Sequence, residues 1–415
     1  MDFRVKHKSL ASLGISRIKW AAQEMKVLNA IKDEFEKTRP FRDLIVGACL
    51  HVTAETAVLA LTLQSGGAEI YLCASNPLST QDDVASALVY EYGVPVFAVR
   101  GDNKDDYYRN IQAVISKKPA CIIDDGCDLT MEILKNFQET GYRPCFGCEE
   151  TTTGVLRLRA LESAGKLIFP VLAVNDSRTK NLFDNRYGTG QSVVDALLRS
   201  TNYLLAGKVC VVCGYGWCGR GIAKNLRGMG CRVRISEVDP ITALEAVMDG
   251  FDVGTLHDFI GDADIVVTAT GNINVVRKEH LVKAKNGVIL ANAGHFDVEI
   301  EVNCIENLTL VEGRRELYRG IIGDTQVFLL AQGRLCNLGC AEGHPSSVMD
   351  LSFSTQALGV RFLLERWIDL KPSVISVPTE IERKIAELKL KSMSIKLDEL
   401  TTLQKEYLSS YEFGT

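Results

Sequence analysis

Short apolar runs alternate with helix-like segments through the second half of the chain. The runs cover residues 208–213, 231–236, 263–268 and 287–291, and each ends in small or polar residues. Runs of this length, separated by segments with helical spacing of apolar side chains, are typical of parallel strands joined by crossover helices. The pattern between residues 207 and 343 therefore predicts a doubly wound parallel sheet.

The first half of the chain has the same rhythm, with five further strand candidates at residues 44–50, 69–74, 94–99, 120–123 and 169–174. We therefore expect the α/β class, with two doubly wound Rossmann-like domains built on parallel sheets. Residues 345–367 have the apolar spacing of a long buried helix that returns to the first domain. Residues 378–411 have an amphipathic helical pattern, which predicts a short C-terminal tail that caps its own domain or packs on a partner subunit.

One of these strand candidates runs into a glycine loop, Gly214-x-Gly216-x-x-Gly219, followed by a helix-like segment. Such glycines permit a tight turn and close approach of a pyrophosphate to a helix N-terminus. The next apolar run ends in Glu237, near the offset of about 20 residues at which an acidic side chain binds ribose hydroxyls. The loop predicts a bound dinucleotide, and Glu237 favours NAD over NADP, although Arg232 and Arg234 lie on the same strand.

Composition narrows the class of protein. The 415 residues are 46% hydrophobic and 24% charged, and the length indicates at least two domains. The net charge is −5 with no basic block, so we expect no nucleic-acid partner. No segment resembles a signal peptide or a membrane span, so we expect no membrane association and a cytoplasmic location.

Thirteen cysteines raise the question of a metal site, because two pairs have C-x-x-C spacing: Cys145 with Cys148, and Cys210 with Cys213. Residues three apart on a strand point to opposite faces, so Cys210 and Cys213 cannot share an ion. Cys145 and Cys148 lack a second pair at zinc-site spacing. We therefore expect no metal.

Ionisable and polar residues follow several strand candidates, where parallel strands of such sheets face a ligand crevice. His51, Asp124 and Asp125, Glu149 and Glu150, and Asn175 and Asp176 each come directly after an apolar run. Lys180, Asp184 and Asn185 follow just before the glycine-loop domain. The sequence therefore predicts a reaction in a cleft between the two domains.

Several motifs match one family along nearly the whole chain. They are Leu50-His51-Val52-Thr53-Ala54-Glu55-Thr56, Ser79-Thr80-Gln81-Asp82, Asp124-Asp125-Gly126, Glu149-Glu150-Thr151-Thr152-Thr153-Gly154, Asn175-Asp176-Ser177, Phe183-Asp184-Asn185, Gly294-His295-Phe296-Asp297, Gly333-Arg334-Leu335 and Gly343-His344-Pro345. With these motifs the chain resembles S-adenosylhomocysteine hydrolase. The resemblance implies a substrate-binding domain of residues 1–182 and 346–377, an NAD-binding domain of 183–345 and a tail of 378–415.

The resemblance also implies the chemistry. In that family a tightly bound NAD oxidises the ribose 3′-hydroxyl, homocysteine leaves from C5′ by elimination, water adds, and the ketone is reduced again. Such a site needs a base at the 3′-hydroxyl, a base at C4′ and an acid or base near C5′. The implied catalytic residues are Lys180 with Asp184 for the 3′-hydroxyl, Asp125 for C4′, Glu150 for the ribose hydroxyls, and His51 and His295 for the sulfur and the water. We expect burial to lower the pKa of Lys180 and make it a usable base.

The remaining site residues are also implied by the resemblance. Substrate binding is expected from Asp125, Glu150, Lys180, Asp184 and His295, and in addition from Thr53, Glu55, Gln81, Glu342, His344 and Met349. NAD binding is expected from Thr151, Thr152, Thr153, Asn185, Gly214, Tyr215, Gly216, Trp217, Cys218, Gly219, Glu237, Thr242, Thr270, Ala293, Gly294, His295, Asn337 and His344. A homo-oligomer, tetrameric or dimeric, is the implied assembly.

Three departures from the family pattern bear on function. Many members carry a tail with lysine and tyrosine that reaches the NAD of a neighbouring subunit, and this chain stops at Glu412-Phe413-Gly414-Thr415, so we expect easier NAD loss. Thr242 stands where an asparagine is expected. Glu342 stands where methionine often lines the base pocket, and an acidic side chain there favours donors on the purine. S-inosylhomocysteine is therefore an alternative to the adenosyl substrate.

Two further functions fit the same architecture. One is an NAD-dependent dehydrogenase of small hydroxy or amino acids, since fold alone does not separate it from a hydrolase. The other is a catalytically silent NAD-binding regulatory relative. The three threonines and the Lys180-x-x-x-Asp184-Asn185 motif favour the hydrolase, and the acid and base residues are retained, which disfavours the silent relative.

Overall fold

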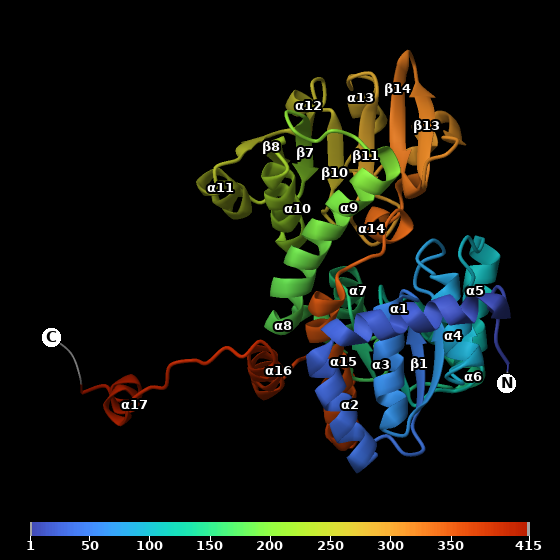
Figure 1. The fold of residues 1–415 in the computed structure, drawn as a ribbon, viewed down its shortest axis with the longest axis vertical. Helices are drawn as coiled ribbons and strands as arrows, with labels where there is room; N and C mark the ends of the chain where they lie inside the picture. The colour runs from blue at the N-terminus through green and yellow to red at the C-terminus, as the bar shows by residue number, and fades with distance from the viewer. Residues whose placement is uncertain (1, 413–415) are drawn as a thin grey trace.

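The computed structural model describes residues 2–412 as two α/β halves and a protruding tail (Figure 1). Glu412 is the last described residue, so Phe413, Gly414 and Thr415, the end of the chain on which the tail expectation depends, lie outside the described part. Two segments connect the halves, one containing the helix α9 (Thr189–Thr201) and the other the residues between α14 (Cys336–Gly339) and α15 (Ser346–Arg366).

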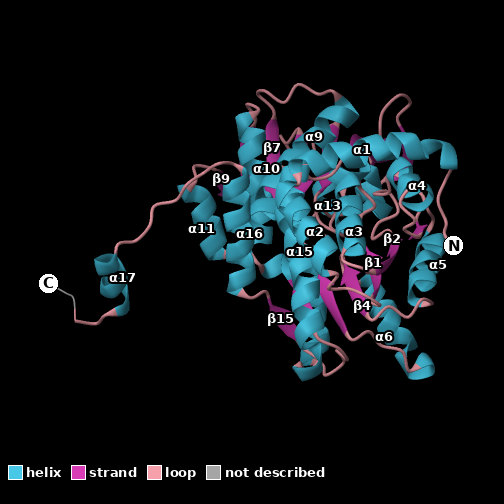
Figure 2. Ribbon diagram, turned by 60° about the horizontal axis from the view of Figure 1, so that its bottom comes forward, coloured by secondary structure: helices cyan, strands magenta, loops and turns pink. Residues whose placement is uncertain are grey.

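The first half contains an all-parallel seven-stranded sheet in the order β15-β6-β5-β4-β1-β2-β3. Its strands are β1 (Ile45–Cys49), β2 (Glu69–Cys73), β3 (Val96–Phe97), β4 (Cys121–Asp124), β5 (Phe146–Glu149), β6 (Val171–Ala173) and β15 (Val374–Ser376). Its helices before α9 are α1 (Ala11–Glu24), α2 (Lys26–Thr38), α3 (Ala54–Ser65), α4 (Asp82–Tyr90), α5 (Lys104–Ile115), α6 (Asp128–Thr140), α7 (Thr152–Ser163) and the short α8 (Arg178–Lys180). The central strands are buried because helices cover both faces of the sheet (Figure 2), whereas the edge strand β15 is only partly buried.

The second half contains an eight-stranded sheet in the order β12-β13-β14-β11-β10-β7-β8-β9. Its strands are β7 (Val209–Cys213), β8 (Arg232–Ser236), β9 (Asp252–Gly254), β10 (Ile265–Thr268), β11 (Val288–Asn292), β12 (Glu306–Leu310), β13 (Leu317–Ile322) and β14 (Thr325–Leu330), and its helices besides α9 and α14 are α10 (Trp217–Gly228), α11 (Pro240–Met248), α12 (Leu256–Phe259) and α13 (Lys278–Leu281). The pairs β12–β13 and β13–β14 are antiparallel, a departure from the all-parallel expectation at one edge only. The predicted α/β class with two Rossmann-like sheets is confirmed.

The long helix expected near residues 345–367 is α15, and it packs in the core of the first half through side chains such as Leu351, Phe353 and Leu363. The exact domain boundaries stay a prediction. In the tail, α16 (Thr379–Ser392) buries Ile385 against the first half, whereas α17 (Thr402–Ser409) stands away from the body (Figure 1). No helix among residues 2–412 has both the length and the apolar character that a membrane crossing requires.

Candidate active site

A cavity of about 370 Å³ lies where the two halves meet. One wall comes from the carboxyl ends of β1, β4 and β5, and the other from the glycine loop after β7 and the segments after β10 and β11. The first wall follows from strand register, because Asp124 of β4 is paired with Glu149 of β5. Asp125 and Glu150, the residues that follow β4 and β5, are therefore neighbours at the carboxyl edge of the sheet, where ligands of such sheets bind.

Lys180 lies at the centre of a buried charged group. Its Nζ is 3.5 Å from Asp184 Oδ1 and 3.9 Å from Glu150 Oε1, and it donates a 2.7 Å hydrogen bond to Asn185 Oδ1. Burial disfavours the ammonium, but the carboxylates of Asp184 and Glu150 outweigh burial, so the pKa of Lys180 is raised. The expected lowering of this pKa is wrong, because both carboxylates lie within 4 Å of the amine.

Asp184 is also the partner of His344, whose Nδ1 lies 2.9 Å from Asp184 Oδ1. Burial alone would raise the pKa of Asp184, but Lys180 and His344 hold it below its ordinary value. Lys180 ends the short helix α8, and Asp184 lies one turn later in the π-helical segment Asn181–Gly188. This irregular turn places a buried ammonium, a carboxylate and the amide of Asn185 on one side of the cavity.

Glu150 is the carboxyl group in this cluster whose pKa lies nearest to neutrality. Burial raises its pKa to about 7, although Lys180 opposes the shift. Two side chains of α15 donate hydrogen bonds to it, Ser352 to Oε1 and Gln356 to Oε2. Glu150 can therefore gain or lose a proton near neutral pH while it stays fixed in place.

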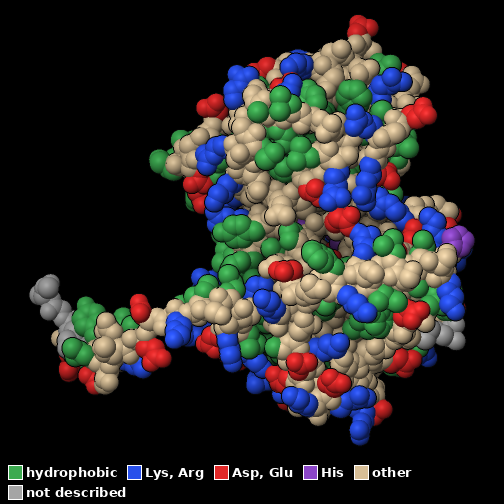
Figure 3. Space-filling view, in the orientation of Figure 1, with side chains coloured by type: hydrophobic (Ala, Val, Ile, Leu, Met, Phe, Trp, Pro, Cys, Tyr) green, Lys and Arg blue, Asp and Glu red, His purple; other side chains and the backbone are tan. Residues whose placement is uncertain are grey.

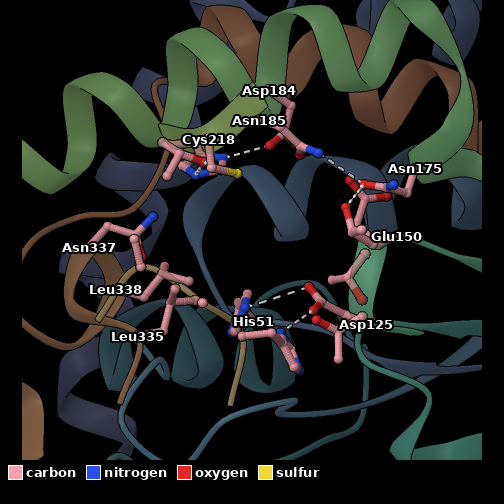
Figure 4. Close-up of a pocket in the computed structure, with 18 of the residues that line it drawn as sticks. His51, Asp125, Glu150, Asn175, Asp184, Asn185, Cys218, Leu335, Asn337 and Leu338 are labelled. Atoms are coloured by element: carbon pink, nitrogen blue, oxygen red, sulfur yellow. Dashed lines mark hydrogen bonds and ion pairs between the residues drawn. The ribbon is translucent and has the colours of Figure 1, made fainter. Parts of the chain in front are cut away.

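His51 and Asp125 lie on the side of the cavity opposite Asp184 and Asn185 (Figure 4), and together with His295 they form a second cluster. Asp125 lies 3.6 Å from His51 Nε2 and 3.3 Å from His295 Nδ1, and the ligand-type atoms of the three residues lie within 4.8 Å of one another. Burial lowers the pKa of His51 to about 3 and also lowers that of His295, so both imidazoles are neutral. Burial raises the pKa of Asp125. The expectation that the protein holds no metal stays a prediction.

Asp124 and Glu149 directly precede the catalytic candidates Asp125 and Glu150, and their hydrogen bonds support the local backbone. Asp124 accepts hydrogen bonds from the backbone N–H groups of Leu129 and Thr130, so it caps the first turn of α6. Glu149 Oε1 accepts from the backbone N–H of Gly126 at 2.9 Å and of Thr151 at 3.0 Å, and sequence reasoning gave Glu149 no role. Burial, followed by repulsion from Asp124, raises its pKa well above the ordinary value.

The glycine loop fits a dinucleotide. Gly214 has φ of +94°, a Cβ on Gly219 would overlap the carbonyl oxygen of Gly214, and Gly216 has open space beside its α-carbon. Glu237 Oε2 accepts a 2.7 Å hydrogen bond from the N–H of Tyr215, which holds the carboxylate beside the loop. In the cavity wall, the buried Oδ1 of Asn337 has no hydrogen-bond partner among the described residues, as expected for a group that binds a ligand.

Most of the predicted site residues line this one cavity. They are His51, Thr53, Glu55, Asp125, Glu150, Thr151, Thr152, Thr153, Lys180, Asp184, Asn185, Gly216, Trp217, Cys218, Thr270, Ala293, Gly294, His295, Asn337, His344 and Met349. Seven lie outside its lining: Gln81, Gly214, Tyr215, Gly219, Glu237, Thr242 and Glu342. Thr242 lies in the first turn of α11, where its N–H bonds to Asp239.

Glu342 lies outside the lining of the cavity. Its carboxylate pairs with Arg17 of the first half and with Arg199 of the second half, and it is about half exposed. Its backbone carbonyl accepts a hydrogen bond from Gln81. Glu55, by contrast, lines the cavity and accepts a 2.6 Å hydrogen bond from Ser346. Glu342 is thus held by two arginines, and its expected role at the purine stays a prediction.

Sequence reasoning missed several apolar and small side chains of the cavity wall. These are Leu50, Thr56, Leu156, Thr189, Ala269, Gly271, Leu335, Leu338 and Phe353, and the polar Asn175 was noted without a role. It also missed Glu299, which accepts from the backbone N–H groups of Thr270 and Gly271 at 3.0 and 2.9 Å. The one signal in the sequence is that Thr270 follows the strand β10, since a loop at that place needs acceptors for its backbone N–H groups.

Comparison with known proteins gives two family matches and several close relatives. The model described as S-adenosyl-L-homocysteine hydrolase matches residues 2–145, and the model of its NAD binding domain matches residues 185–343. An adenosylhomocysteinase of Aquifex aeolicus is 52% identical, and the match covers all of both chains. An S-inosyl-L-homocysteine hydrolase of Methanopyrus kandleri is 50% identical over all of this chain and 98% of the other, and that of Methanocaldococcus jannaschii is 49% identical over all of both.

Proposed function

Because the chain belongs to the S-adenosyl-L-homocysteine hydrolase family, we propose that it catalyses the NAD-dependent, reversible hydrolysis of S-adenosyl-L-homocysteine to adenosine and L-homocysteine. The observation that supports this most is the pair of buried acid and base clusters in one cavity with the glycine loop. When bound, NAD would supply a reversible hydride acceptor at the ribose. The glycine loop, Glu237, Thr270 and Asn337 would hold it.

The cluster at Lys180 would act on the ribose hydroxyls. As an ammonium, Lys180 would stabilise negative charge that develops on the 3′-oxygen rather than remove the proton by itself. Glu150, with a pKa near 7 and a place 3.9 Å from Lys180, would accept that proton and return it. Asp184 would keep Lys180 charged and oriented through their 3.5 Å contact.

The opposite cluster would act on C4′ and C5′. Asp125 would remove the C4′ proton, because it is buried and flanked by two imidazoles that are neutral in the resting site and can take up a proton only transiently. His51 and His295 would pass the proton taken by Asp125 on to the leaving sulfur, and would later accept a proton from the water that adds at C5′. Thr53 and Glu55, at the start of α3, would contact the purine.

A direct test combines cofactor content with product release. Purified protein is denatured and assayed for released NAD, and S-adenosyl-L-homocysteine turnover is followed by free thiol. Lys180→Ala should lower thiol release by about 100-fold or more, while the exposed Lys166→Ala should leave it unchanged. Full activity in Lys180→Ala would overturn the role of Lys180, and absence of NAD from the holoprotein would overturn the function.

S-inosyl-L-homocysteine is the second candidate substrate, because two relatives that are about half identical over the whole chain carry that name. The two thioethers differ only at the purine, so kcat/KM for each, measured with the same protein, decides between them. A dehydrogenase would instead reduce added NAD in proportion to product.

We also propose a homo-oligomer, tetrameric or dimeric, in the cytoplasm, and mass photometry measures the oligomer size.

A further inference from the structure

A second cavity, of about 310 Å³, adjoins the active site at the boundary between the two halves. Ser79, Thr80 and Gln81 line it from the first half, Arg315 lines it from the second half, and Leu338 lies in the walls of both cavities. Figure 3 shows Lys and Arg side chains gathered along this boundary, beside a hollow between the halves. Of the residues expected to bind substrate, Gln81 lines this second cavity, and no role has been given to its other lining residues.

The second cavity meets the active site beside His51, the residue proposed above to act on the sulfur. The Oγ of Ser79 lies 2.8 Å from Nδ1 of His51, and the other ring nitrogen of His51 faces Asp125. A thioether sulfur handled by His51 would therefore lie close to the wall that contains Ser79. In homocysteine, four covalent bonds separate the sulfur from the carboxyl carbon, so the amino-acid end must extend beyond the nucleoside cavity.

Arg315 is the cation of this cavity that has no carboxylate partner among the described residues. Its guanidinium donates only to the carbonyl oxygen of Ala341, at 3.4 Å. The nearby Arg17 pairs with Asp83, and Arg100 lies 3.5 Å from Glu316 and donates to the Gly339 carbonyl oxygen. Arg315 is partly exposed, and its partial burial, followed by repulsion from the other arginines, lowers the pKa of its guanidinium. An anion placed here would relieve that repulsion.

Thr80 gives an independent indication of a ligand. It is 1% exposed, it belongs to the lining of the same cavity, and its Oγ1 has no hydrogen-bond partner among residues 2–412. A buried hydroxyl without a partner costs free energy unless a ligand or water completes it. An orphan hydroxyl and a guanidinium without a carboxylate partner together have the chemistry of a carboxylate site.

We propose that this cavity binds the α-amino-acid end of homocysteine, with Arg315 on the carboxylate and Thr80 as a supporting donor. This inference rests on the proposed function and extends it, because it assigns the binding of the amino acid to residues outside the nucleoside cavity. Arg315 is a binding residue here and takes no part in the chemistry at the ribose. The site would select thiols that carry a carboxylate.

The test uses the synthetic direction, in which adenosine and a thiol condense, with two thiols that differ only in the carboxylate: homocysteine and 3-aminopropane-1-thiol. Arg315→Gln should raise the KM for homocysteine at least about tenfold, because it removes a charge-assisted contact. It should leave the KM for adenosine and the turnover with 3-aminopropane-1-thiol within about twofold of the wild type. Thr80→Val should raise the KM for homocysteine by a smaller factor in the same direction. Arg314→Gln is the matched control, because Arg314 is exposed like Arg315 and adjacent to it in sequence but absent from the lining of the cavity.

The possible failures are distinguishable. If the wild type condenses adenosine or inosine with homocysteine and Arg315→Gln leaves the KM for homocysteine unchanged, the subsite is overturned alone. The same holds if Arg315→Gln weakens both thiols equally, or if Arg314→Gln has the same effect. If the wild type forms no thioether from either nucleoside, the proposed function fails and the subsite fails with it.

Discussion

The pKa of Glu150 near 7 leads to a quantitative prediction for the pH dependence of catalysis. If ionised Glu150 accepts the 3′-hydroxyl proton, kcat/KM must rise as pH increases through the pKa of this group. For a pKa of about 7, about a tenth of the protein has ionised Glu150 at pH 6 and about nine-tenths at pH 8, so kcat/KM should rise roughly tenfold over that interval. His51 does not explain such a limb, because its pKa of about 3 keeps it neutral throughout.

The assay is initial thiol release from S-adenosyl-L-homocysteine between pH 5.5 and 9, quenched and developed at one fixed pH. Glu150→Gln keeps the shape and the contacts with Ser352 and Gln356 but cannot ionise, so activity should fall by about 100-fold or more and the acidic limb should disappear. Asp124→Asn is the control, because burial also raises the pKa of Asp124 to about 7, yet its hydrogen bonds come from the backbone N–H groups of Asp125 and of the first turn of α6, and it does not line the cavity. An acidic limb that persists in Glu150→Gln and disappears in Asp124→Asn would refute the assignment.

Three further predictions concern the supports of the site. Gly219→Ala should remove most of the bound NAD measured after denaturation, because its Cβ meets the Gly214 carbonyl oxygen, whereas Gly228→Ala at the open end of the same helix should retain NAD. Glu149→Gln keeps an acceptor for Gly126 and should hold kcat within a few-fold, while Glu149→Ala should lower kcat about tenfold or more as the Asp125 loop loses that bond. Equal rates in these two variants would contradict a positioning role. Lys389→Met should lower the free energy of unfolding, measured in urea, by about 2 kcal/mol, because it removes the 2.9 Å ion pair and leaves the buried Asp350 without its cation. The same change at the exposed Lys391 should have little effect.

The parts of the molecule that sequence predicts well depend on short-range patterns. The glycine loop and the apolar runs of β7, β8 and β10 are each specified within a few consecutive residues. The gathering of His51, Asp125 and Glu150 also follows from sequence, since the carboxyl ends of parallel strands meet at one edge of a sheet. The pattern did not predict the antiparallel hairpin of β13 and β14, because the side chains of these two strands do not indicate whether they run parallel or antiparallel to their neighbours.

Charge balance could not be predicted from residue types. Burial of Lys180 by itself predicts a lowered pKa, and the opposite result depends on two carboxylates at 3.5 and 3.9 Å, distances that only the folded chain determines. Glu342 shows the same limit, because its place in a family motif suggested the purine pocket, while Arg17 from α1 and Arg199 from α9 hold it at the boundary of the halves. In both cases partners distant in sequence decide the outcome.

Helix α15 shows why distant partners matter for catalysis. Ser352 and Gln356 reach Glu150 across separations of 202 and 206 residues, and Thr355 lies 3.1 Å from Thr179, the residue before Lys180. On the same helix Asp350 accepts hydrogen bonds from the start of α2 and pairs with Lys389 of α16. One buried helix thus fixes both members of the Glu150 and Lys180 pair relative to each other. The polar residues along its buried length are therefore required for the charge arrangement at the ribose, and an apolar replacement of Gln356 would disturb Glu150 without touching the substrate.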